Sequence, residues 1–151
     1  MPNFVVLQHR IGPALERTPG ARTDSSVHFD WMFEGAGTLL TWSTEPVDSV
    51  TKSIDTMAQK LPDHRLAYLT IEGDIGGDRG TVTQVVRGQM EWIENRKLNL
   101  MNLSSGNFFQ AKLKWSENGK AIIRNLSIHR ILDRSDLSED DEREWRLRLG
   151  V

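Results

Sequence analysis

The sequence predicts a mainly β protein, a small antiparallel β-barrel with one mid-chain helix and one C-terminal helix. Many short runs of β-branched and aromatic residues follow one another at close spacing, and glycine-rich turns separate them. Only two segments, residues 48–61 and 138–149, place apolar residues at helical spacing. With 151 residues, of which 38% are apolar and 26% charged, the chain is long enough to bury a core without disulfide bonds.

The N-terminal part begins with a short strand pattern and continues with a hairpin pattern. Residues 4–7 are β-branched or aromatic, and residues 10–26 have the glycine and proline content of a loop. Residues 27–34 alternate between apolar and polar side chains. The Gly-Ala-Gly sequence at 35–37 then turns the chain into residues 38–44, so we expect a β-hairpin here.

The middle of the chain changes its period. Apolar residues within 48–61 recur at three and four positions, the spacing of a helix, and Pro62 ends the pattern. Residues 66–71 return to a strand pattern. Residues 72–80 contain so many glycines that we expect only turns there.

The second half of the chain predicts further strands at 81–86, 89–94, 108–115 and 121–128, with 97–103 as a possible addition. Two short turns separate neighbouring strands. Arg87-Gly88 and Glu117-Asn118-Gly119 have the composition of hairpin turns, and Asn-Gly is the stronger signal.

The C-terminal segment predicts an acidic helical tail. Residues 138–149 start with a Ser-x-x-Asp cap, and Trp145 and Leu149 fall on one helical stripe. We therefore expect residues 1–130 to form one barrel domain and residues 131–151 to form the tail.

Charge and composition limit the classes of partner and compartment. Nineteen Lys and Arg against 21 Asp and Glu give a net charge of −2, which argues against coating of nucleic acid through a general basic excess. The absence of cysteine excludes disulfides and thiolate zinc sites, and it suits a reducing compartment. No apolar run approaches the roughly 18 residues that span a bilayer, and the N-terminus lacks a signal-peptide layout. We expect a cytoplasmic monomer without a membrane partner.

The strand pattern at residues 27–34 contains a pair of potential metal ligands. In a strand, His28 and Asp30 project to one face, opposite three aromatic residues that form the natural core face, and this places the pair on the surface. Alternate Cα atoms lie roughly 6.5–7 Å apart, so both side chains can reach one ion, and His9 is a candidate third ligand. Two imidazoles and a carboxylate suit Mn, Fe, Co or Zn better than Ca or Mg. The alternative is a solvated hydrogen-bonded pair.

Several motifs occur in the order of a known family. They are FVVLQH at 4–9, HFDWMFE at 28–34, GTLLTW at 37–42, DHRLAY at 63–68 and EG at 72–73, continued by GTV at 80–82 and RG at 87–88. This order resembles the phosphoesterase domain of bacterial DNA ligase D over roughly residues 3–130, as a short relative without polymerase or ligase modules.

The resemblance implies a small β-barrel that acts on 3′ ends of nucleic acid in DNA repair by non-homologous end joining. Such domains remove a 3′-phosphate or a 3′-terminal ribonucleotide and depend on manganese; Zn²⁺ or Co²⁺ also suits the donor set. Matched by position, His9, His28 and Asp30 would be the metal ligands. His64 would contact the phosphate and support catalysis, with Tyr68 beside it. The partners would be DNA or DNA/RNA primer-template ends, together with repair proteins.

The chain departs from the family at the phosphate-binding positions. Met32 stands where the family has an arginine, the lysine expected after Trp42 is missing, and Thr56 and Pro62 replace an arginine and an acid. These losses favour an alternative function, a non-catalytic, metal-containing module that binds DNA ends or a repair protein. Candidate replacements for the missing phosphate-binding residues are Arg10 and Arg65, and also Arg17 and Arg22.

Overall fold

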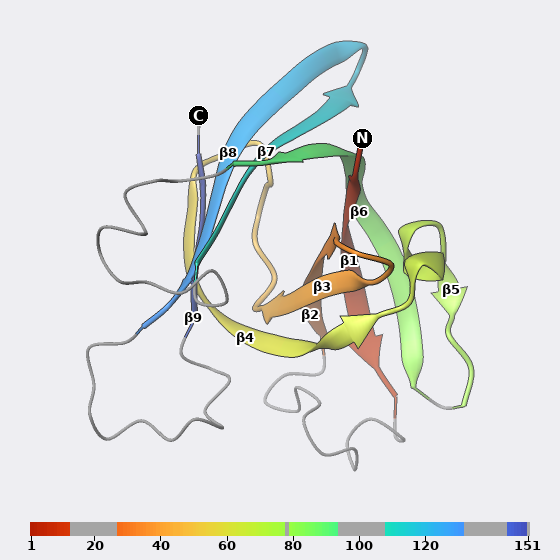
Figure 1. Ribbon diagram of the computed structural model, residues 1–151. Helices are drawn as coiled ribbons and strands as arrows, with labels where there is room; N and C mark the ends of the chain where they lie inside the picture. The colour runs from red at the N-terminus through yellow and green to blue at the C-terminus, as the bar shows by residue number, and fades with distance from the viewer. Residues whose placement is uncertain (13–26, 78, 94–107, 132–144, 151) are drawn as a thin grey trace.

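The computed structural model describes residues 1–12, 27–77, 79–93, 108–131 and 145–150. These residues form one antiparallel sheet with the strand order β1-β2-β3-β4-β9-β8-β7-β6-β5. An additional pairing of β1 with β6 closes eight of the nine strands into a barrel, which Figure 1 shows. The predicted antiparallel barrel is therefore confirmed. No helix within these ranges is long and apolar enough to cross a membrane.

Nine strands and one short 3₁₀ helix make up the described structure. They are β1 (Asn3–Ile11), β2 (Val27–Glu34), β3 (Leu39–Thr44), β4 (Ile54–His64), η2 (Leu66–Leu69), β5 (Gly73–Asp74), β6 (Gly80–Trp92), β7 (Phe108–Glu117), β8 (Lys120–Arg130) and β9 (Trp145–Gly150).

The barrel interior is filled by large apolar side chains from every one of the eight closing strands. Trp31 and Trp42 are completely buried near its middle, and the ring of Phe33 lies 6.0 Å from that of Trp42. Trp145 from β9 packs edge-on against Trp42 at 5.5 Å. Edge-to-face packing of this kind adds to the stabilisation that comes from burying the rings.

Both predicted hairpins with clear turn signals are present. β2 pairs with β3 across the glycine-containing turn, with Glu34 opposite Leu39. β7 pairs with β8 through Asn118 and Gly119, whose φ angles are 51° and 76°. Two successive positive φ angles are the geometry of a type I′ turn, which explains the strength of the Asn-Gly signal.

The predicted helix over residues 48–61 is wrong, because residues 54–64 form β4. Apolar residues recur at three and four positions here because both faces of the strand carry them, although Met57 on the outer face is exposed. Ala58 belongs to the barrel interior, whereas Leu61 pairs with Thr41 on the outer face of the wall and is also buried. Apolar residues on opposite faces of a strand therefore imitate a helical stripe.

The predicted C-terminal helix over residues 138–149 is also wrong, because residues 145–150 form β9. Trp145, Leu147 and Leu149 point into the barrel core and alternate with two arginines, which is the period of a strand. β9 pairs with both β4 and β8. The residues that were expected to cap the helix lie outside the described part of the chain. The division into two parts at residue 130 stays a prediction.

Two smaller expectations are corrected as well. The strand expected at 66–71 is the 3₁₀ helix η2, and the two strands expected around Arg87-Gly88 are one continuous strand, β6. Gly88 is needed for close packing, since a Cβ atom there would lie 2.1 Å from the carbonyl oxygen of Lys114. The possible strand at 97–103 and most of the loop at 10–26 fall outside the described residues.

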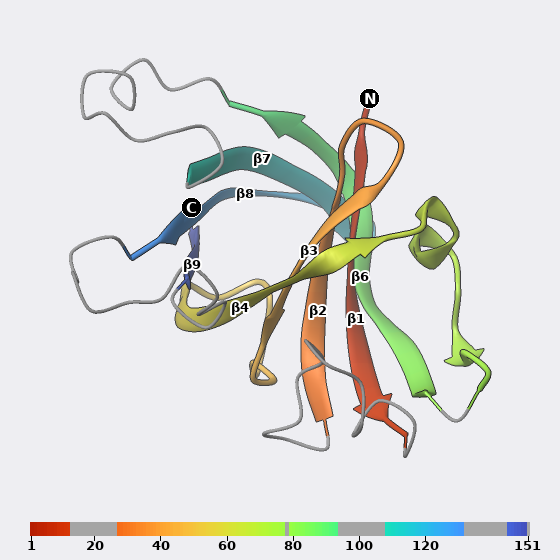
Figure 2. The ribbon, with the colours of Figure 1, turned by 60° about the horizontal axis from the view of Figure 1, so that its bottom comes forward.

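A second, smaller apolar cluster lies on the outer face of the barrel wall. It contains Leu7 and Met32 from β1 and β2, Tyr68 from η2 and Val82 from β6. Figure 2 shows η2 and β5 outside the barrel, beside β1 and β6. These elements cover the outer face of the wall locally, so polar residues on that face become buried.

Candidate metal centre

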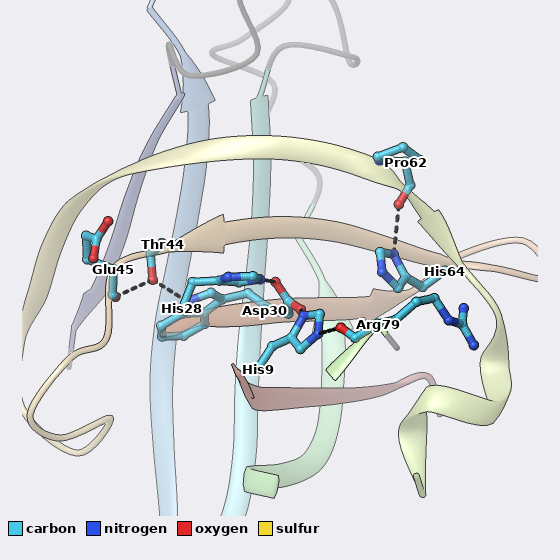
Figure 3. Close-up of polar contacts among 9 residues, drawn as sticks. His9, His28, Asp30, Thr44, Glu45, Pro62, His64 and Arg79 are labelled. Carbon is cyan, nitrogen blue, oxygen red and sulfur yellow. Dashed lines mark hydrogen bonds and ion pairs between the residues drawn. The ribbon is translucent and has the colours of Figure 1, made fainter. Parts of the chain in front are cut away.

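The pairing of β1 with β2 brings the three predicted metal ligands together. His9 and His28 are direct partners across the two strands, and Asp30 follows His28 by two residues on the same face. Side chains of directly opposed residues in an antiparallel pair lie on one side of the sheet. The three ligand atoms all lie within 4.8 Å of one another, as Figure 3 shows for their side chains.

The carboxylate of Asp30 lies between the two imidazoles. His28 Nε2 is 3.0 Å from Asp30 Oδ1, and His9 Nδ1 is 3.3 Å from Asp30 Oδ2. The two imidazole rings meet nearly edge to face, with centroids 4.9 Å apart. All three residues are buried, with 2–6% of their surface exposed. The predicted position of His28 and Asp30 on an open surface is therefore corrected, because both residues are buried.

The two imidazole–carboxylate separations, each measured to a different oxygen of Asp30, fit a shared cation. Two ligand atoms bound to one ion at about 2.0–2.2 Å, at angles of about 90–110°, lie roughly 2.8–3.6 Å apart. Both imidazole–carboxylate distances, 3.0 and 3.3 Å, fall within that range. A His/His/Asp group of this geometry could hold a divalent metal ion and leave coordination positions open.

The electrostatics of the cluster also favour a cation. Burial alone would raise the pKa of Asp30, but His28 and His9 outweigh it and lower that pKa to about 2. Burial disfavours protonation of His9, yet the hydrogen bond and charge of Asp30 outweigh it and raise the pKa of His9. A carboxylate that stays ionised in a buried site needs a positive partner, which is a proton on an imidazole or a metal ion in its place.

The imidazole of His9 is oriented by a hydrogen bond at the ring nitrogen that faces away from Asp30. His9 Nε2 lies 3.0 Å from the carbonyl oxygen of Arg79 and donates to it, so Nδ1 faces Asp30. Hydrogen bonds of this kind to the second ring nitrogen commonly orient metal-binding histidines. The Nδ1 atom of His28 is buried and has no hydrogen-bond partner among the described residues.

His64 and Tyr68, the two predicted catalytic residues, share a small cavity with this cluster. The cavity has a volume of about 90 Å³. The rings of His64 and Tyr68 meet edge to face at 5.2 Å. His64 Nδ1 donates to the carbonyl of Pro62 at 2.8 Å, which leaves Nε2 as the acceptor nitrogen. The residues that line the cavity are His9, Asp30, His64, Tyr68, Ile75, Arg79 and Val82.

Burial lowers the pKa of His64 below its ordinary value of 6.5, and Asp30 and the Pro62 carbonyl offset this only in part. The imidazole is therefore neutral at neutral pH. A neutral histidine with a free Nε2 can accept a proton from water, which is the task of a general base.

The two arginines predicted as phosphate-binding candidates do not line this cavity. Arg10 lies on the face of β1 opposite to His9 and is exposed. Arg65 places its guanidinium over the ring of Tyr68, at 6.0 Å from the centroid. Their role as phosphate ligands stays a prediction, and Arg17 and Arg22 lie outside the described residues.

Sequence reasoning missed Arg79, because residues 72–80 were expected to be turns alone. Arg79 is one of the residues that line the cavity, and its carbonyl orients His9. One signal for Arg79 was available in the sequence. It is an arginine inside a glycine-rich segment, and it directly precedes β6, which pairs with β1, the strand that carries His9. Met32, in contrast, packs into the outer apolar cluster where the resemblance would place an arginine.

Comparison with known proteins gives no matching protein-family model and no matching curated protein. The fold and the site described above define a closed antiparallel barrel with a buried His/His/Asp group that could hold a metal ion.

Proposed function

We propose that this protein is a metal-dependent phosphoesterase that acts on the 3′ ends of nucleic acid. The observation that supports it most is the convergence of His9, His28 and Asp30 beside a cavity that also contains His64. The ordered motifs that resemble the phosphoesterase domain of DNA ligase D add the substrate class, a 3′-phosphate or a 3′-terminal ribonucleotide. A role in the repair of DNA ends follows from the same resemblance, and we propose that the protein acts in the cytoplasm.

We assign Mn²⁺ to the site, with Zn²⁺ or Co²⁺ as alternatives that the same donors accept. His9 and His28 would supply imidazole nitrogens and Asp30 a carboxylate oxygen. A bound divalent ion would polarise the phosphoryl oxygen and neutralise part of its charge. The barrel wall supplies the rigidity, because all three ligands stand on paired strands.

His64 is the residue that we assign to proton transfer. Its Nε2 takes a proton from the attacking water as the water oxygen bonds to phosphorus. The bond between phosphorus and the 3′ oxygen breaks, and that oxygen receives the proton. For a 3′-phosphate end the products are a 3′-hydroxyl and inorganic phosphate. The hydrogen bond from Nδ1 to Pro62 keeps Nε2 available for this transfer. Tyr68 packs on the imidazole and limits its rotation.

A second function has its own support. Met32 is buried in an apolar cluster, so the position that carries an arginine in the family contributes nothing to phosphate binding here. A module that keeps the barrel and the metal, and binds DNA ends or a repair protein without cleaving anything, would tolerate this loss.

One assay separates the two functions. The protein is incubated with Mn²⁺ and a primer-template that ends in a 3′-phosphate or a 3′-ribonucleotide, together with the variants His28→Ala and His129→Ala. His129 stacks on Phe108 on another part of the barrel and serves as the matched histidine control. We expect release that requires Mn²⁺, that His28→Ala abolishes and that His129→Ala retains. Absence of release, with end binding that His28→Ala leaves unchanged, would exclude the enzyme.

A further inference from the structure

Arg79 is the only arginine of the described residues that lines the cavity beside the candidate metal ligands. Figure 3 shows its side chain running from the carbonyl beside His9 past His64. The cavity is therefore bordered by two of the metal ligands, His9 and Asp30, and by Arg79, whose side chain passes His64. A negatively charged group in the cavity could contact both a metal ion on these ligands and Arg79.

The guanidinium of Arg79 is held in place by the turn that carries it. Its Nε donates to the carbonyl of Gly76 at 3.1 Å, and Nη2 donates to the carbonyl of Ile75 at 2.5 Å. The backbone of Arg79 is fixed as well, because its carbonyl accepts hydrogen bonds from the amide of Gly12 and from His9. Of the five N–H groups, three have no hydrogen-bond partner among the described residues. A pre-positioned guanidinium loses less entropy on binding than a mobile one.

We propose that Arg79 binds the phosphate of the substrate, in place of the arginine that the chain lacks at Met32. This inference rests on the proposed function and deepens it. Arginine binds phosphate oxygens through two parallel N–H groups, and the remaining donors of Arg79 provide such a pair. Arg79 also lines the same cavity as His9, Asp30 and His64.

The charges of the site select a phosphate monoester. A divalent ion, the Asp30 carboxylate and the Arg79 guanidinium together leave two positive charges in excess when both imidazoles are neutral. A terminal phosphate carries close to two negative charges near neutral pH, since its second pKa is about 6. A phosphodiester carries one. The electrostatic match is therefore better for a 3′-phosphate end than for an internal phosphodiester.

The size of the cavity is compatible with this substrate. Its volume of about 90 Å³ is roughly that of three water molecules at about 30 Å³ each. A single phosphoryl group fits such a space, with the attached nucleoside outside it. Because of the charge match, we assign 3′-phosphate ends, and not 3′-terminal ribonucleotides, as the preferred substrate.

The test measures phosphate binding separately from catalysis. Equilibrium dialysis with trace radiolabelled inorganic phosphate is carried out on the Mn²⁺-loaded wild type and on Arg79→Gln, Arg79→Lys and Arg148→Gln. Arg148 is an exposed arginine on β9 and is the matched control. We expect Arg79→Gln to weaken phosphate binding at least tenfold, Arg79→Lys to recover part of it, and Arg148→Gln to change nothing. Mn²⁺ affinity, measured in parallel, should stay within twofold for all variants.

Phosphate binding that survives Arg79→Gln would overturn the proposal, as would a loss caused by Arg65→Gln and not by Arg79→Gln. Kinetics provide the second measurement. We expect kcat/KM at least tenfold higher for a 3′-phosphate end than for a 3′-ribonucleotide end, and Arg79→Gln should reduce this ratio. An equal ratio in wild type and variant would contradict the assignment. If the wild type released nothing, the phosphoesterase function would fail, while dialysis would still decide the role of Arg79.

Discussion

The two faces of β2 are equally buried but chemically opposite. The aromatic side chains of β2 point into the barrel; they are Phe29, Trp31 and Phe33. His28 and Asp30 point to the outer face of the barrel. No residue among these five is more than 5% exposed. Burial therefore does not distinguish the functional face from the structural one.

The difference between the faces lies in what burial costs. Apolar rings gain free energy when they leave water, at roughly 25 cal/mol per Å². Imidazoles and a carboxylate lose hydration, and only their mutual contacts offset that loss. The inner face should therefore determine stability and the outer face should determine binding. The predictions below test this separation.

The largest effect is expected from Trp31→Ala. The ring is completely buried, and its Nε1 donates to Thr44 Oγ1 at 3.0 Å. Removal leaves a cavity in the barrel interior and takes away the donor to the Thr44 hydroxyl, which keeps its own hydrogen bond to the carbonyl of Glu45. The expected cost is about 3–5 kcal/mol. The free energy of unfolding in urea measures the loss, and Trp31→Phe, which keeps most of the ring volume, should lose clearly less. Equal losses would show that the hydrogen bond, and not packing, is decisive.

A smaller effect is expected from Asp30→Ala in the metal-free protein. The two imidazoles lose their common acceptor while buried, and an unsatisfied polar group costs about 1–3 kcal/mol. A triple variant, His9→Leu, His28→Leu and Asp30→Val, should instead keep the free energy of unfolding within about 1 kcal/mol of wild type or raise it. Both proteins should lose Mn²⁺ binding, measured by calorimetry. A triple variant that is less stable than Asp30→Ala would contradict the separation between the two faces.

Acid should reveal the same cluster without mutation. The pKa of Asp30 is lowered from its ordinary 3.8 to about 2 by His28 and His9, against the effect of burial. A lowered pKa means that the carboxylate stabilises the fold above about pH 4, and that this contribution disappears as the pH falls towards 2. The loss should be on the order of 2 kcal/mol and should be absent in Asp30→Asn. Urea unfolding at pH 5, 4, 3 and 2.5 measures it.

The sequence determined the barrel better than it determined each strand. The hairpins were predictable because alternation and turn residues agree locally, as in β2 and at Asn118-Gly119. β9 was not predictable, because a spacing of four residues places Trp145 and Leu149 on one side of a helix and also on one face of a strand. Leu147, halfway between them, fits only the strand. β4 was mistaken for a helix because Leu61 on its outer face is buried as well as Ala58 on its inner face. No local sequence pattern indicates that an outer-face residue is buried.

The site divides in a similar way. His28 and Asp30 are two residues apart, so a strand alone places them on one face. His9, at the end of another strand pattern, was the candidate third ligand, and the family resemblance implied the same set. Strand register then explains the convergence, because His9 pairs with His28. Arg79 could not be placed, since its position depends on the turn after β5 and on the pairing of β6 with β1.

The smallest effect is expected from Asp55→Asn on the exposed seam between β4 and β9. Asp55 resembles Asp30 in having two basic partners: Arg146 binds it through two hydrogen bonds of 2.7 and 2.8 Å, and Arg148 lies at 3.4 Å. These arginines lower the pKa of Asp55, so its contribution is present above the ordinary pKa and is lost as the pH falls below it. Water and salt screen the pair, because all three side chains are about half exposed.

The melting temperature of Asp55→Asn should therefore differ little from wild type at low salt, and the difference should disappear in 0.5 M NaCl. This salt concentration is about five times the ionic strength at which the Debye length is about 10 Å, so the ion pairs are strongly screened. A change as large as that of Asp30→Ala, insensitive to salt, would mean that the β4–β9 seam closes the barrel through its ion pairs. Because Ile54, Thr56 and Ala58 already pair inwardly with Leu149, Leu147 and Trp145, we expect the apolar side of the seam to close it. The same carboxylate chemistry then has a large effect on stability at Asp30 and a small one at Asp55, because of these two residues only Asp30 is removed from water.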